Sequence, residues 1–302
     1  MESVRSRGAG VPWDAVRRVG QLAVGMGLLV WGINSNLSWV TFTAIFGAIF
    51  IPAEALLAFT PQRFFRRRLG NDTMHWFVTT ALSAQGMGWV SGIGVGLLAI
   101  ALHPLGLAGH IVRQPAALQF AEALVLTYLV VYWIHRAMHK YNFLWRFHVI
   151  HHSAGEVNWM TAARFHPLDV VIQRGAAVTV VYAMGFSSAA LSVYVLYEAF
   201  QSIWVHANFD VRIGPIKWLI ANPEFHHWHH ANDPAVYNKN FCEWPLMDLL
   251  FGTAYMPRGK RPAGYGVPQQ VPESYVGQLL APLPSLRSRR REDSPAGTVV
   301  GG

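Results

Sequence analysis

Long apolar segments that alternate with clusters of arginine constrain the fold of this chain more than any other feature. Two runs, 37–59 and 76–102, reach the roughly 20 residues that a helix needs to cross a bilayer. A third run covers 116–134, and a shorter one covers 19–33. Buried core helices of a soluble protein are the alternative, but flanking arginines are typical of membrane spans. The pattern predicts an all-α, polytopic membrane helical bundle with about four transmembrane helices.

Composition and charge agree with a membrane protein. The chain is 52% hydrophobic and 13% charged, whereas soluble domains carry about a quarter charged residues. The net charge of +8 comes from basic residues beside the apolar runs, as at 5–18, 63–68 and 287–291. This placement favours cytoplasmic loops near an anionic leaflet over nucleic-acid binding. We expect an integral protein of a bacterial inner membrane, with no nucleic-acid partner.

Shifts in composition divide the chain into four segments. An N-terminal cytosolic segment at 1–18 precedes a transmembrane region at 19–115 and a histidine-rich domain at 116–258. The remainder, 259–302, is rich in Pro, Gly, Arg and Ser and predicts a largely disordered tail. Within the histidine-rich domain, the apolar region 170–205 is broken near its middle by Gly-Phe-Ser-Ser. Its halves are short for full spans, which predicts a re-entrant or interfacial hairpin.

Histidines are the candidate functional residues. Cys242 is the only cysteine, so an intramolecular disulfide and a CxxC metal site are excluded. Metal chemistry must therefore use histidine, carboxylate or water. Of the 14 histidines, all but three lie at or after position 135, on predicted cytosolic segments or their membrane-proximal ends. We interpret His103 and His110 as loop residues of the opposite side and His75 as an interfacial residue.

Three histidine clusters have the spacing of metal ligands. The first has the pattern H-x3-H, which places two imidazoles on one face of a helix. The second and third have the pattern H-x2-H-H, in which the two adjacent histidines point about a hundred degrees apart, so that three imidazoles can serve two neighbouring ions. Imidazole binds zinc, copper, iron and nickel, and affinity alone does not choose among them. The clusters are His135 and His139; His148, His151 and His152; and His226, His229 and His230.

Three further histidines lie near these clusters. His166 precedes Pro167 in the segment ARFHPLD, and His206 ends the apolar region 170–205. Spacing alone leaves each of them open between a ligand and a structural residue. His227 lies inside the third cluster, but it points to a different helix face and is not expected to bind metal.

The order and spacing of these residues resemble the fatty acid hydroxylase/sterol desaturase superfamily of membrane di-iron enzymes. The resemblance covers about 124–255 and rests on the blocks YWIHRAMH, FHVIHHS, NWMTAARFHPLD and HHWHH, followed by Asn240-Phe241 and DLLFGT. It implies that 116–258 is the catalytic domain and that a cytosolic cap holds two metal ions. It also implies that His166 and His206 are ligands. The implied ligands are His135, His139, His148, His151, His152, His166, His206, His226, His229 and His230.

The same resemblance implies the chemistry. Two iron ions activate O2 and oxidise a lipid or sterol-like substrate from the bilayer to a hydroxyl or a double bond, and zinc can occupy the site in a purified protein. Protein side chains cannot do this, so no catalytic residue is expected beyond the ligands. The chain has no Gly-rich dinucleotide motif, so electrons must come from an external donor such as a ferredoxin or a cytochrome and its reductase. Among members, it looks most like sterol-desaturase-like and alkylglycerol-monooxygenase-like proteins. Tyr128 departs from the pattern, since many relatives have an acidic residue there.

Three other functions compete with an oxygenase. A histidine-rich membrane metal transporter is the main alternative, but it would want ionisable residues at mid-membrane, where the runs offer few. A zinc hydrolase would need a general base beside an open metal position, and the chain has no HExxH motif. A structural membrane protein with a stray metal site would leave three ordered clusters unexplained.

Overall fold

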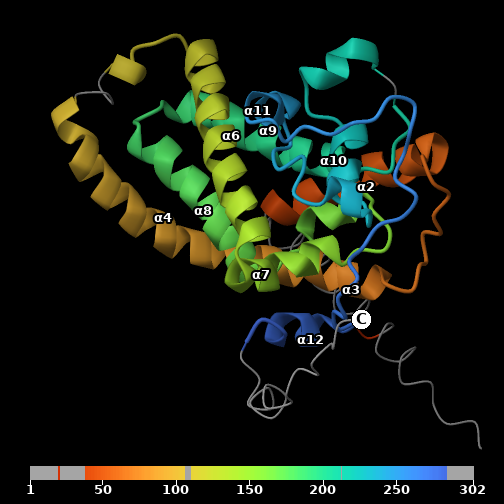
Figure 1. Ribbon diagram of the computed structural model, residues 1–302. Helices are drawn as coiled ribbons and strands as arrows, with labels where there is room; N and C mark the ends of the chain where they lie inside the picture. Colours follow the sequence, from red (N-terminus) through yellow and green to blue (C-terminus); the bar gives the residue numbers. More distant parts are fainter. Residues whose placement is uncertain (1–19, 21–37, 106–109, 212, 284–302) are drawn as a thin grey trace, which may run out of the picture.

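The structure, a computed structural model, describes residues 38–105, 110–211 and 213–283, together with residue 20. Within these ranges the chain is all-helical and forms no β-strand (Figure 1). Two isolated bridges join Ala58 to Phe209 and Ala231 to Tyr265. The predicted N-terminal segment and nearly all of the apolar run 19–33 lie outside the described residues. The prediction of an all-α fold is confirmed for the described part of the chain.

Two helices are long and apolar enough to cross a membrane, Leu69–Leu102 and Ala116–Lys140. The first is a continuous helix with a π-helical turn in it, and the second ends in the first histidine cluster. A further apolar stretch, Thr41–Leu57, is shorter. The total of about four transmembrane helices therefore stays a prediction. The elements concerned are α2 (Ser38–Leu57), α3 (Leu69–Met74), η1 (His75–Thr79), α4 (Thr80–Leu102) and α6 (Ala116–Lys140).

The outer face of α4 is apolar and exposed. Trp89, Ile93, Leu97 and Ile100 recur three or four residues apart and are between 65% and 76% exposed. Within the described part of the chain, none of the most hydropathic stretch of the Leu69–Leu102 helix is buried. An apolar stripe of this length without a protein neighbour fits contact with lipid rather than with water.

The apolar region 170–205 forms a pair of helices, α8 (Pro167–Ala183) and α9 (Ser188–His206). The turn between them contains Gly185 at φ 76°, a left-handed conformation that favours glycine. α8 packs closely along α4 and also against α6 (Figure 1). Gly86 of α4 permits this approach, because a Cβ built there would lie 2.7 Å from a methyl group of Val171. The two halves are thus helical, as predicted, and they bring α9 beside α6.

Short helices complete a cap over the ends of α6 and α9. α10 has a strong start signal, because the Asn222 side chain accepts a hydrogen bond from the Phe225 amide at 3.0 Å and Pro223 occupies the first turn. The cap therefore holds the second and third histidine clusters on regular helices. Its elements are α7 (Asn142–His152), η3 (Trp159–Ala163), η4 (Gly214–Trp218), α10 (Pro223–His229), η5 (Pro234–Val236) and α11 (Pro245–Leu250).

Part of the segment that the sequence assigns to a C-terminal tail is structured. α12 (Tyr275–Leu280) packs beneath α3 and η1, where Gln278 Oε1 lies 2.7 Å from His75 Nε2. His75 is fully buried by this contact rather than interfacial, which corrects the sequence-based interpretation. The sequence did not predict α12 because this helix has only six residues and lies in a segment rich in Pro, Gly, Arg and Ser. Residues 284–302 lie outside the described part of the chain.

Candidate metal centre

Nine of the ten predicted ligands come together in two adjoining groups. Within each group, the nearest ring nitrogens all lie within 4.8 Å of one another. α6, α7, α9 and α10 supply eight of the nine rings, and His230 directly follows α10. We call the groups the five-histidine group, which contains His135, His139, His148, His152 and His229, and the four-histidine group, which contains His151, His206, His226 and His230.

The histidine spacing explains how the clusters divide between the groups. Each pair four residues apart on a helix shares one group, as His148 and His152 do in the five-histidine group. His151, which lies between them, turns to the four-histidine group. In the third cluster, His226 and His230 belong to the four-histidine group, and His229, which lies between them, belongs to the five-histidine group. Each H-x2-H-H pattern thus divides its three imidazoles between two neighbouring groups.

Ring nitrogens approach one another closely inside each group. In the five-histidine group, His135 Nε2 lies 2.7 Å from His148 Nε2 and 3.1 Å from His229 Nε2. In the four-histidine group, His206 Nε2 lies 2.9 Å from His226 Nε2 and 3.3 Å from His151 Nε2. Metal–imidazole bonds of about 2.0–2.1 Å place neighbouring ligand nitrogens roughly 3 Å apart. The observed spacings match such coordination shells.

Hydrogen bonds on the far side of the rings fix which nitrogen carries the proton. Nδ1 of His229 donates to the Lys239 carbonyl at 2.9 Å, and Nδ1 of His135 donates to the Phe241 carbonyl. A carbonyl oxygen can only accept, so the nitrogen facing it must carry the hydrogen. In the neutral ring the other nitrogen, Nε2, is then an unprotonated acceptor. The four-histidine group shows the same arrangement, because Nδ1 of His206 donates to the Ser202 carbonyl at 2.6 Å.

These tautomers make the Nε2 contacts repulsive unless a cation lies between them. His135 and His229 both present a lone pair at Nε2, yet these atoms are 3.1 Å apart. His151 and His206 face each other in the same way at 3.3 Å, with their Nδ1 atoms bonded to the carbonyls of Arg164 and Ser202. Two lone pairs cannot form a hydrogen bond with each other. A metal ion bound by both nitrogens would convert the repulsion into coordination, so the donor set fits one ion in each group.

Burial keeps these imidazoles neutral. Removal from water lowers the pKa of His151, His152, His226 and His230 well below the usual 6.5, and the neighbouring histidines lower it further. The same desolvation lowers the pKa of His229 to about 3. Neutral imidazole is the form that binds metal. At neutral pH the rings therefore do not need to lose a proton before they bind an ion.

A constrained loop presents the two carbonyls that orient the five-histidine group. Asn238 and Asn240 have φ values of 62° and 56°, a left-handed conformation that asparagine tolerates better than most residues. The Asp248 carboxylate accepts hydrogen bonds from the amides of Phe241 and Cys242, each at 2.8 Å. The downstream blocks Asn240-Phe241 and DLLFGT therefore fix the backbone carbonyls that accept hydrogen bonds from the histidine rings.

The structure brings neither His166 nor His227 into a metal group. His166 Nδ1 accepts from the Leu168 amide at 3.1 Å and caps the start of α8, and its Nε2 lies 3.2 Å from the Leu279 carbonyl. The ligand role implied for His166 is therefore not supported, because both of its ring nitrogens already have hydrogen-bond partners. His227 Nδ1 is hydrogen-bonded to the Tyr265 hydroxyl at 2.8 Å, and its Nε2 lies 3.2 Å from the His206 carbonyl.

Asp169 is a site residue that sequence reasoning missed. Its carboxylate lies 2.8 Å from His148 Nδ1, and both side chains are buried. A carboxylate behind a ligating histidine fixes the ring orientation and raises its basicity. The signal was present in the sequence HPLD, because a proline at the first helical position places this aspartate in the first turn of α8.

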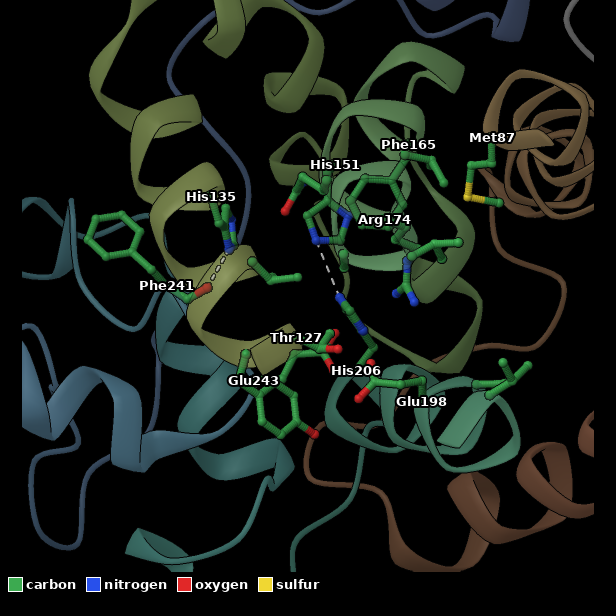
Figure 2. Close-up of a pocket in the computed structure, with 18 of the residues that line it drawn as sticks. Met87, Thr127, His135, His151, Phe165, Arg174, Glu198, His206, Phe241 and Glu243 are labelled. Atoms are coloured by element: carbon green, nitrogen blue, oxygen red, sulfur yellow. Dashed lines mark hydrogen bonds between the residues drawn. The ribbon is translucent and has the colours of Figure 1, made fainter. Parts of the chain in front are cut away.

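A cavity of about 260 Å³ opens onto both metal groups. Figure 2 shows His135, His151 and His206 around it, and Met87 of α4 also lines it. Its walls are mostly apolar, and α6, α8 and α9 supply most of them. A cavity with these walls beside a metal centre can admit an apolar molecule next to the metal.

Comparisons with known proteins cover the segment that contains both histidine groups. A sequence model of the fatty acid hydroxylase family matches residues 120–253, and members of this family use iron. No solved structure matches the chain significantly. The comparisons lend no support to the metal-transporter alternative.

Three curated relatives show how far the similarity extends. The ornithine lipid hydroxylase of Rhizobium tropici is 28% identical over 274 residues, which cover 87% of this chain and 78% of that protein. The alkylglycerol monooxygenase of Xenopus tropicalis is 28% identical over 48% of this chain and 33% of its own length. Methylsterol monooxygenase 1 of Danio rerio is 27% identical over 40% of this chain and 42% of its own length. The chain thus spans less than half of the last two relatives.

Proposed function

We propose that the protein is a membrane-bound di-iron oxygenase that hydroxylates or desaturates a lipid, because the model of the fatty acid hydroxylase family matches residues 120–253. It would use O2 and electrons from an external donor such as a ferredoxin or a cytochrome with its reductase. The observation that carries this proposal is the convergence of unprotonated Nε2 atoms in two adjoining groups. Relatives that are hydroxylases, monooxygenases and desaturases support oxygen-dependent oxidation as the reaction class.

We assign one iron ion to each histidine group. The nine histidines of the two groups would be the ligands, and His166 and His227 would not, because their ring nitrogens have other partners. Bound iron supplies the activation of O2, which no protein side chain can provide. The chain's own residues orient the rings through the backbone carbonyls and Asp169, and burial of eight of the nine histidines restricts access of water.

The cavity next to both groups is the proposed position of the reacting carbon. Its apolar walls suit a hydrocarbon segment, and the exposed apolar face of α4 suits a substrate that arrives from the bilayer. The Rhizobium tropici relative, which matches most of the chain, is a lipid hydroxylase. This similarity favours hydroxylation over desaturation.

The same reasoning supports an orientation in the membrane. Arg63, Arg66, Arg67 and Arg68 precede the first long apolar helix, and Arg136 and Lys140 lie at the end of the second. By the positive-inside rule, these ends face the cytoplasm, together with the histidine groups. We propose an integral protein of a bacterial inner membrane with about four spans, of which two lie among the described helices.

The test uses the purified full-length protein loaded with ferrous iron. We expect about two iron ions per chain, because each of the two histidine groups should bind one ion. With a reductant and a bacterial lipid extract, the protein should consume O2 and yield a lipid that has gained one oxygen atom or lost two hydrogen atoms. Folded His229→Ala protein that keeps full activity would contradict the proposal, as would wild-type protein that binds no iron.

A further inference from the structure

The cavity beside the metal groups has a polar side that the proposed oxidation does not explain. One face of each of α6, α8 and α9 lines this cavity. Side chains four residues apart lie on the same face of a helix. On α9, Glu198 and His206 lie on the same face, two turns apart. On α6, one helix face likewise carries Thr127, Val131 and His135. The helices that supply the histidines therefore also supply polar groups to the cavity.

Two carboxylates and one guanidinium lie on this polar side. Glu198 comes from α9, Glu243 from the loop before α11, and Arg174 from α8. Figure 2 shows Glu198, Thr127 and Glu243 on one side of the cavity. Arg174 donates to the Ser202 hydroxyl at 2.8 Å, and Glu243 accepts from Gln201 at 3.2 Å. Among the described residues neither carboxylate forms an ion pair, and the cavity is lined by two acidic groups but only one guanidinium.

Several polar atoms around the cavity lack a partner. The hydroxyls of Thr127 and Tyr128 and the Oε1 atom of Glu198 are buried without a hydrogen bond to any described residue. Thr127 is 2% exposed and Tyr128 is 4% exposed. The Tyr128 hydroxyl lies near Glu198. Buried polar atoms without partners are rare because each costs about 1–3 kcal/mol. Three of them around one cavity indicate a polar ligand group.

We propose that this cavity binds the protonated amine of a lipid headgroup between Glu198 and Glu243, and that the substrate is therefore an amine-bearing lipid. This inference rests on the proposed function, since it takes the cavity as the substrate site. An ammonium group has three donors and one positive charge. It can bond both carboxylates and one hydroxyl, and it adds a positive charge to a cavity that has two acidic groups and one guanidinium. The apolar walls then hold the carbon chain next to the amine.

The charge of the site favours an amine over a neutral polar group. An alcohol, such as a sterol hydroxyl, offers one donor and leaves the buried negative charge without compensation. Burial raises the pKa of Glu243 above its usual range, although the Arg174 guanidinium and the Gln201 hydrogen bond act in the opposite direction. Because His135, His151, His206 and Glu198 all line one cavity, an amine held at Glu198 places its neighbouring carbons beside the metal groups.

The test compares two probes of equal chain length, tetradecylamine and tetradecanol. Each is bound at equilibrium to iron-loaded, full-length protein in a neutral detergent without O2, so that no turnover is required. We expect the amine to bind about ten- to a hundredfold more tightly than the alcohol, which is the usual range for hydrogen bonds to charged groups. Equal affinities for the two probes in the wild-type protein would overturn the inference.

Matched variants locate the preference. Glu198→Gln and Glu243→Gln keep the side-chain shape and remove the charge, so each should reduce the preference for the amine about tenfold. Glu122→Gln on α6 is the control, because Glu122 lies outside the cavity and contacts Gln114; it should keep the wild-type preference. Iron content checks that each variant is folded. An unchanged preference in both cavity variants would contradict the assignment.

Failure of this inference can be told apart from failure of the proposed function. Oxidation of a lipid without any preference for the amine would leave the oxygenase intact and remove the amine site. A clear preference for the amine in a protein that oxidises no lipid would support the amine site and contradict the proposed oxygenase function. Lipids of the bacterial extract can also be acetylated at their amines before the assay. If an amine-bearing lipid is the substrate, acetylation should abolish its oxidation.

Discussion

The two histidine groups are built from the same helices but are held differently. In the five-histidine group, a buried carboxylate supports one ring, and backbone carbonyls orient His135 and His229. In the four-histidine group, carbonyls orient His151 and His206, whereas the Nδ1 atoms of His226 and His230 are buried without a partner. Within the described residues, only the five-histidine group has a carboxylate behind a ring.

This difference indicates two sites of unequal affinity. Five imidazoles come closer than four to filling the shell of a six-coordinate ion, and the Asp169 carboxylate makes His148 a stronger donor. The four-histidine group lacks this support, and two of its rings are held by packing alone. We expect the five-histidine group to retain its ion more tightly and the four-histidine group to be the more adjustable site.

Removal of one ligand from each group should have the largest effect. We expect His148→Ala and His226→Ala each to lose about one iron ion per chain and at least a hundredfold in activity, since both ions are needed. Iron content and O2 consumption measure the two effects. His110→Ala, which replaces an exposed histidine between α4 and α6, should change neither. If one substitution removed both ions, the two groups would form a single cooperative site, and the comparison would fail.

Asp169→Asn should act on one group alone. It keeps the shape of the side chain but removes the negative charge 2.8 Å from His148 Nδ1. Loss of such a partner typically lowers metal affinity about 10- to 100-fold. Iron affinity measured in a His226→Ala background should fall by this factor, because only the five-histidine ion remains there. In a His148→Ala background, Asp169→Asn should leave the remaining ion unchanged.

Removal of iron with a chelator should proceed in two steps. The ion of the four-histidine group should leave first, at a chelator concentration about tenfold lower, since it has fewer ligands and no carboxylate support. Iron content plotted against chelator concentration would show a plateau near one ion per chain. A single step would mean that the two affinities are alike despite the different hydrogen bonding. In Asp169→Asn protein the two steps should move closer together.

The comparison also shows which parts of the site the sequence could predict. Helix periodicity is local, so the spacing of His148, His151 and His152 was sufficient to predict three imidazoles serving two sites. The all-α class followed equally from the long apolar runs. The carbonyls of Lys239 and Phe241 could not be found in this way, because every residue has a carbonyl and only tertiary structure selects two of them.

Polar groups around the cavity escaped prediction for a related reason. Glu198 and Glu243 are 45 positions apart in the sequence, and neither has a motif around it. Only the packing of α9 against α6 and of the loop before α11 brings them to one cavity. Long-range contacts of this kind depend on the whole fold rather than on local spacing. The C-terminal helix α12 was missed likewise, because its partners lie about two hundred positions upstream.

His166 is the residue for which family resemblance and geometry disagree, and its substitution should have the smallest effect. The proline that follows it fixes an extended backbone at His166, which suits a helix cap. His166→Ala should therefore keep about two iron ions per chain and lower the free energy of unfolding by about 1 kcal/mol, the usual value of an N-cap. His166→Asn should restore that stability, because asparagine is a better cap. A ligand role predicts the opposite pattern, in which His166→Ala loses iron and His166→Asn does not restore it.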